Sequence, residues 1–179
     1  LWKTLQQNPQ NEFDELLSKY FAFFHELYRR KERKEYNYCE SCTVMLKNIL
    51  VAFWYIELGY QCNSLGDWSK YEGKRSILKS FQLNYLDKWT PVLVGGTEIF
   101  MESINMEILK SAKQTAKRYN LYFNEKQFNE INKNINKDTN KDNQNLDSVC
   151  FTAAHLTNLF IDKKYDSSSS HTPKIHVDS

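Results

Sequence analysis

The chain has 179 residues and a formal charge of +2, and 41% of its residues are hydrophobic and 15% aromatic. This length suits one domain with tails, and the many Phe and Tyr side chains can bury enough area to form a core. Five Gly and three Pro are too few for the turns of a many-stranded sandwich or barrel. The composition therefore favours an all-α fold, and the near-neutral charge indicates no particular class of partner.

The first predicted element is an amphipathic helix over residues 12–34. Its apolar residues recur at spacings of three and four, which is the pattern of a helix with one buried face. Acidic residues at its start and basic residues at its end also suit the helix dipole. The apolar positions are Phe13, Leu16, Leu17, Tyr20, Phe21, Phe24, Leu27 and Tyr28.

Three further helices are predicted before residue 121. The second covers 41–61 and is apolar on more than one face, so we expect it to be central. The third starts near Asp67 and ends before Trp89, and the fourth runs from Thr97 to a stop at Asn120. The apolar run 92–94 between them fits a short strand or a buried connector.

A change in composition within the last third of the chain predicts where its domain boundaries lie. Residues 129–145 hold seven Asn, and so polar a tract cannot bury enough surface to offset its ordering entropy. We therefore expect a helical domain over 1–120, an Asn/Lys-rich low-complexity loop or linker over 121–147, a helix packed on the domain over 148–164 and a polar tail over 165–179. The fold is expected to be an irregular helical bundle or a short, solenoid-like array of helical hairpins.

Neither a membrane span nor a secreted disulfide framework is predicted. The apolar runs, such as 49–56, are much shorter than the roughly 20 residues that cross a bilayer, so we expect no transmembrane segment. The four cysteines are scattered and no Asn-x-Ser/Thr sequon occurs. These features favour an intracellular location, in the cytoplasm or nucleus.

Cys39 and Cys42 form the single C-x-x-C motif of the chain. A structural zinc site would need a second pair of ligands at suitable spacing, which the sequence lacks. A thioredoxin-type site would need a preceding strand in a βαβ unit. Structural cysteines are therefore the favoured interpretation, with thiol redox chemistry or metal binding as the less favoured alternatives. The four histidines also lack a nucleophile at a recognisable spacing, so we expect no enzyme, no metal and no cofactor.

A basic cluster over residues 29–34, which includes Arg29, Arg30 and Arg33, ends the first predicted helix. Such a cluster could contact nucleic acid, an anionic membrane or an acidic protein. Glu32 interrupts it and Glu35 follows it, so a solvated helix end is the competing interpretation.

Residues 54–59 (Trp-Tyr-Ile-Glu-Leu-Gly) and 65–71 (Leu-Gly-Asp-Trp-Ser-Lys-Tyr) resemble the first helix and turn of a tetratricopeptide-type hairpin. The resemblance covers residues 54–87 and includes a Leu-Gly pair followed by a Gly-Asp-aromatic turn. The sequence departs from the family where its second helix needs a small residue, because Tyr71 and Arg75 stand there. Neighbouring segments show no second copy of the pattern, whereas such arrays need at least three. The resemblance implies a non-catalytic scaffold that holds a peptide or a partner helix.

These patterns together predict a non-catalytic helical scaffold or adaptor, as part of a larger chain or assembly, that binds another protein. Nucleic-acid or anionic-membrane binding through residues 29–34 is the alternative. Tyr, Trp and Arg are enriched at binding hot spots. The predicted partner-binding residues are accordingly Arg29, Arg30, Arg33, Trp54, Trp68, Tyr71 and Trp89.

Overall fold

The computed structural model describes residues 9–61, 68–74, 76–88 and 96–142, without the side chains of 69–70 and 136–142. Within these ranges the secondary structure consists of helices and no strand, which confirms the all-α prediction. The helices are α1 (Gln10–Glu32), α2 (Tyr36–Leu58), α3 (Trp68–Tyr71), α4 (Ser80–Asp87), α5 (Thr97–Tyr119) and α6 (Glu125–Asp142). The predictions for Trp89, for a strand at 92–94, for a helix at 148–164 and for a tail at 165–179 lie outside the described residues.

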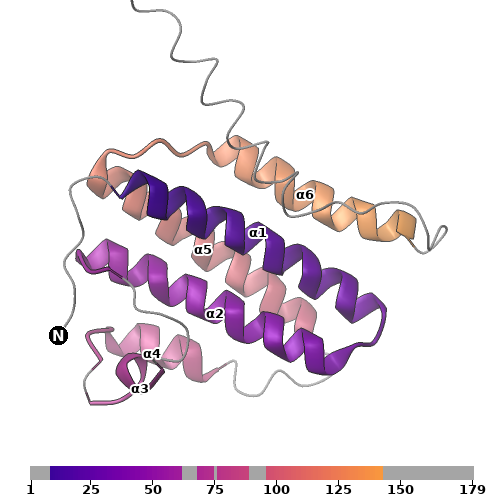
Figure 1. Cartoon of the computed structure of the whole chain (residues 1–179), viewed down its shortest axis with the longest axis horizontal. Coiled ribbons are helices and arrows are strands. Elements are labelled where there is room, and N and C mark those ends of the chain that lie inside the picture. The colour runs from indigo at the N-terminus through magenta and orange to yellow at the C-terminus, as the bar shows by residue number, and fades with distance from the viewer. Residues whose placement is uncertain (1–8, 62–67, 75, 89–95, 143–179) are drawn as a thin grey trace, which may run out of the picture.

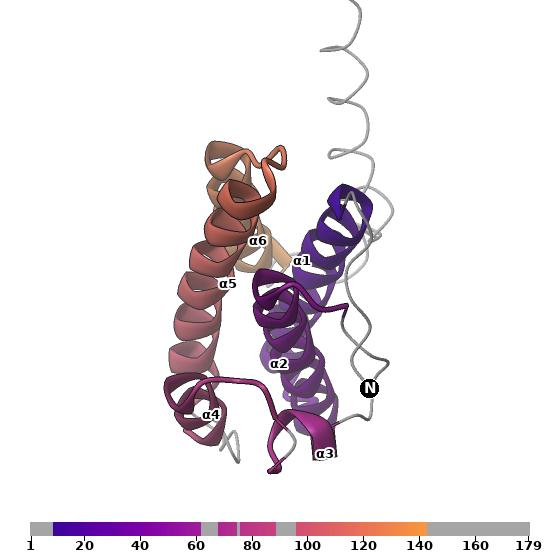
Figure 2. The same ribbon diagram turned by 90° about the vertical axis from the view of Figure 1, so that its left-hand side faces the viewer.

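The four long helices form a bundle, and α3 and α4 lie at one end of it (Figures 1 and 2). Helices α1 and α2 make a tight antiparallel hairpin in which Lys34 adopts a left-handed conformation with φ of 60°. The amides of Lys34 and Glu35 donate to the last carbonyls of α1 at 2.9 and 3.0 Å, respectively. These bonds satisfy helix-end acceptors that would otherwise lack partners.

Helix α2 is the centre of the core, as its apolar composition predicted. It packs against both α1 and α5, and Leu50, Val51 and Phe53 have no exposed surface. It ends at Gly59, whose φ of +90° is left-handed, a conformation that costs a glycine little. The hydroxyl of Tyr119 on α5 donates to the carbonyl of Ile56 at 2.9 Å and so ties the end of α2 to α5.

The expectation that no segment could span a membrane was wrong. By length and composition α2 could cross a bilayer, because an 18-residue window within it has a mean hydropathy of 1.3. The prediction considered only unbroken apolar runs and overlooked that isolated polar residues still leave a long helix apolar on average. In this structure 72% of that window is buried against the rest of the chain, and a buried core helix meets the same criteria.

The third predicted helix is present as two pieces. Helix α3 ends at Tyr71, and α4 does not begin until Ser80. Between them the amide of Ser76 donates to the carbonyl of Gly73 at 2.8 Å, and the side chain of Ser76 accepts from the amide of Leu78 at 3.1 Å. These turn bonds replace helical ones. The spacing of aromatic residues predicted helix where α3 and α4 are found, but it did not predict the non-helical turn between them.

Helix α6 occupies residues that were expected to form a loop or linker. Asn124 caps it, because its side chain accepts from the amide of Gln127 at 3.0 Å. Phe128, Ile131 and Ile135 follow at helical spacing and are buried, and α6 packs on both α1 and α5. Three large apolar side chains on one face are thus sufficient to hold an otherwise polar helix, although its average composition resembles that of a linker.

Candidate functional site

The basic cluster at residues 29–34 is largely neutralised by carboxylates of the same chain. Arg29 and Arg30 both pair with Glu26, at 3.0 and 2.9 Å, and Arg30 also pairs with Glu35 at 2.6 Å. The hydrogen bonds that Arg30 donates to Glu35 and Glu26 raise the pKa of its guanidinium. The guanidinium of Arg30 lies 4.3 Å from the ring centroid of Tyr38 on α2. The cluster therefore joins α1 to the start of α2.

The same region is also tied to α5. Lys31 pairs with Glu98 in the first turn of α5, whereas Arg33, the residue after α1, is exposed. Of the three predicted arginines, Arg33 therefore has the most accessible charge, while Arg29 and Arg30 are half-buried in ion pairs. This internal pairing reduces the positive field that phosphate groups would meet.

The aromatic residues predicted to bind a partner are mainly packing residues. Trp54 is 2% exposed and Tyr71 is 1% exposed. Tyr71 contacts Tyr55 and Trp68 in T-shaped pairs, with ring centroids 5.3 and 5.7 Å apart. Trp68 is half-buried in that contact. The edge-to-face contacts of Tyr71 with Tyr55 and Trp68 thus join α3 to α2.

The two cysteines of the C-x-x-C motif are buried thiols without a disulfide. Burial raises the pKa of both, to about 12 for Cys42, with Glu26 adding to the effect there. A protonated thiol is a poor nucleophile and a poor metal ligand. Within the described ranges no three His, Cys, Asp or Glu side chains are grouped so as to hold a metal ion.

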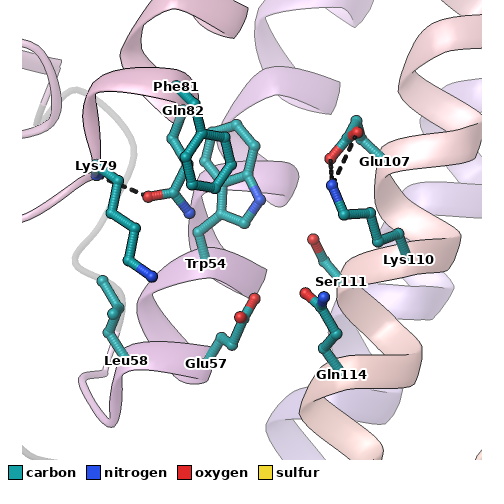
Figure 3. Close-up of a pocket in the computed structure, with 10 residues that line it drawn as sticks. All are labelled: Trp54, Glu57, Leu58, Lys79, Phe81, Gln82, Glu107, Lys110, Ser111 and Gln114. Carbon is teal, nitrogen blue, oxygen red and sulfur yellow. Dashed lines mark hydrogen bonds and ion pairs between the residues drawn. The ribbon is translucent and has the colours of Figure 1, made fainter.

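A groove with a cavity of about 150 Å³ opens between α2, α4 and α5 (Figure 3). Helix α4 reaches α5 through side chains that span the gap. The hydroxyls of Tyr85 and Ser103 are 2.7 Å apart, and Lys110 lies 6.0 Å from the ring centroid of Phe81. The lining residues are Trp54, Glu57, Leu58, Lys79, Phe81, Gln82, Glu107, Lys110, Ser111 and Gln114.

The groove contains charges of both signs at different depths. Glu57 is half-buried near the end of α2, and burial raises the pKa of its carboxyl against the lowering effect of nearby cations. The amide of Gln114 faces this carboxylate (Figure 3), and with its nitrogen on that side it donates to both oxygens at 3.3 Å. Lys110 pairs with both oxygens of Glu107 at 3.3 Å, and Lys79 is exposed.

Large apolar side chains are exposed on both α4 and α5. Phe81 is 57% exposed, Ile99 63% and Met106 64%. Ile99, Met106 and Lys110 share one face of α5, because their spacings of seven and four are helical. We call the surface formed by Phe81, Ile99 and Met106 the α4–α5 face. Sequence reasoning missed it, although Ile99 and Met106 fall outside the buried repeat Phe100, Ile104 and Ile108.

No family model, curated protein or solved structure matches this chain. The tetratricopeptide-type resemblance over 54–87 stays a prediction, and its turn at 65–67 lies outside the described residues.

Proposed function

We propose that this chain is a non-catalytic helical scaffold or adaptor whose α4–α5 face binds another protein. The observation that carries the proposal is the exposure of Phe81, which lines the groove, and of Met106 and Ile99 on the adjoining face of α5. Single exposed apolar residues are common. Here, however, three of the seven large hydrophobic side chains exposed in the described residues lie on the neighbouring helices α4 and α5. Exposed apolar residues next to a groove are typical of protein-binding surfaces.

The remaining sites support this choice of surface. Arg29 and Arg30 are paired with Glu26 and Glu35, which leaves less free charge for an electrostatic contact. Trp54 and Tyr71 are buried, so their large rings stabilise the bundle. The α4–α5 face is different because its side chains are large, apolar and in contact with solvent.

Site-specific photocrosslinking in cells tests the proposal. Benzoylphenylalanine is placed at Met106 in the full-length protein, and a second variant carries it at Tyr122. Tyr122 is a matched control because it is 65% exposed and follows α5, away from the α4–α5 face. We expect a crosslinked protein of defined mass at position 106, its yield reduced by Phe81→Ser and Ile99→Ser, and no such product at position 122.

Two results would contradict the proposed function. The first is crosslinking of equal yield at positions 106 and 122, or a product at 106 that the two serine substitutions leave unchanged. The second is turnover of a small molecule by the purified full-length protein, since a scaffold has no chemistry of its own.

A further inference from the structure

The groove beside the α4–α5 face has an apolar and acidic interior. Trp54, Leu58 and Phe81 supply apolar surface, and the carboxylate of Glu57 lies among them (Figure 3). Lys79 is exposed at the rim, where water and salt weaken its field. A half-buried charge such as that of Glu57 is screened less than an exposed one.

Two of the other charges of the groove, Lys110 and Glu107, are paired with each other. The ammonium group of Lys110 pairs with both oxygens of Glu107 and also lies over the ring of Phe81, so its positive charge already has a partner. Glu57, in contrast, receives a neutral donor, the amide of Gln114. The pKa of the Glu57 carboxyl is raised, because burial raises it by more than the charges of Lys79, Arg118 and Lys110 lower it. An added cation beside Glu57 would offset this desolvation.

We propose that the groove binds one arginine or lysine side chain of the partner protein, with its cationic head on Glu57 and its aliphatic stem along Trp54 and Leu58. The cavity of about 150 Å³ is smaller than the roughly 300 Å³ at which drug-sized ligand sites begin, and it suits a single side chain. A cation also gains from the face of an exposed aromatic ring, which Phe81 supplies. This inference rests on the proposed protein-binding function and names the residue type that the site selects.

Titration of the whole protein with capped amino acids tests the proposal. The probes are N-acetyl-arginine amide, its neutral isostere N-acetyl-citrulline amide, and N-acetyl-glutamate amide. Binding is followed by NMR at the indole N–H of Trp54 and the side-chain amide of Gln114. We expect saturable shifts with the arginine probe and binding at least about fivefold weaker with citrulline, a factor that corresponds to roughly 1 kcal/mol.

Two variants separate recognition by charge from a general effect on the fold. Glu57→Gln keeps a polar group beside Gln114 but removes the charge, and it should reduce arginine binding to the citrulline level. Glu130→Gln is the matched control, because Glu130 is exposed on α6 and its loss changes the net charge equally. This control should leave arginine binding unchanged.

Several results would overturn the inference: equal binding of arginine and citrulline, tighter binding of glutamate, an unchanged affinity in Glu57→Gln, or no shift with any probe. These outcomes are distinguishable from failure of the proposed function. If crosslinking at Met106 still captures a protein while the arginine probe does not bind, the face is a docking surface and the groove is not a cation site.

Discussion

Replacement of Phe128 by Ala tests whether α6 is part of the folded core. Phe128 has no exposed surface. Its ring stacks on Tyr20 with centroids 5.5 Å apart, and it lies 5.1 Å from Phe21 and 6.0 Å from Phe123. A buried Phe→Ala substitution costs about 3–5 kcal/mol, and aromatic pairs contribute about 0.5–1.5 kcal/mol each beyond the buried area. We therefore expect a loss near the upper end, about 4–5 kcal/mol.

Urea unfolding followed by far-ultraviolet circular dichroism measures this loss. The matched control is Asn129→Ala, one residue along on the exposed face of α6, which should change the free energy of unfolding by less than about 0.5 kcal/mol. Phe128→Leu refills most of the space and should cost about 1–1.5 kcal/mol. A loss below about 1 kcal/mol for Phe128→Ala would refute the packing argument and return α6 to the status of a linker helix.

Three further predictions follow from buried polar groups. The Tyr20 hydroxyl has one proton to donate, which it directs to Oδ1 of Asn105 at 2.7 Å, with Oδ1 of Asn132 at 3.3 Å as a second, weaker acceptor. Tyr20→Phe should therefore cost about 1–3 kcal/mol in urea unfolding, and no loss would contradict this hydrogen bonding. Burial raises the pKa of Glu57 above its ordinary 4.5, so its carboxylate lowers stability as pH rises through that range. At pH 7 the Glu57→Gln variant should therefore unfold at a higher urea concentration than the parent protein. Well below pH 4.5 the two proteins should unfold at the same urea concentration. A stabilisation seen only at acidic pH would refute this reasoning. Because burial raises the pKa of the thiols of Cys39 and Cys42, peptide mapping should find both unalkylated by iodoacetamide at neutral pH until urea unfolds the chain. Rapid labelling in the folded state would instead support thiol chemistry.

The sequence predicted the long helices where apolar residues recur on one face. Helix α1 was expected over 12–34 and covers Gln10–Glu32, because its stripe of Phe, Leu and Tyr repeats without interruption. The end of α5 was also predicted, since Asn120 adopts the left-handed conformation with φ of 51° that asparagine accepts more readily than most residues. Local signals of this kind act within a few residues and can be recognised without tertiary structure.

The helix α6 was missed because composition was given more weight than spacing. Over residues 125–135 most of its polar residues are exposed, and Asn132 is buried beside the hydroxyl of Tyr20. Phe128, Ile131 and Ile135 have the spacing of a buried helix face, and this signal was present in the sequence. The sequence did not reveal which residues pack against this face. In the structure Tyr20 and Phe21 of α1 contact Phe128.

The predicted site residues show a similar division. Glu26 stands four residues before Arg30, so their ion pair could have been anticipated from helical spacing. The contact of Lys31 with Glu98 joins residues 67 positions apart, so it depends on tertiary structure. Trp54 was proposed as a binding residue, although it lies within the apolar run 49–56, where burial is the simpler expectation.

The groove could not be predicted, because its walls come from three separate helices and depend on how these pack together. Its position nevertheless has a consequence for how binding would affect the fold. Trp54 packs edge-on against Tyr85 of α4 with centroids 6.0 Å apart, and Glu57 lies one turn further along α2. A side chain bound on Glu57 would therefore contact the last turn of the core helix and the ring that holds α4. Since bound ligand stabilises the state to which it binds, an arginine-bearing partner should fix α4 against α2 and α5, with the exposed Phe81, Ile99 and Met106 becoming buried in the same event.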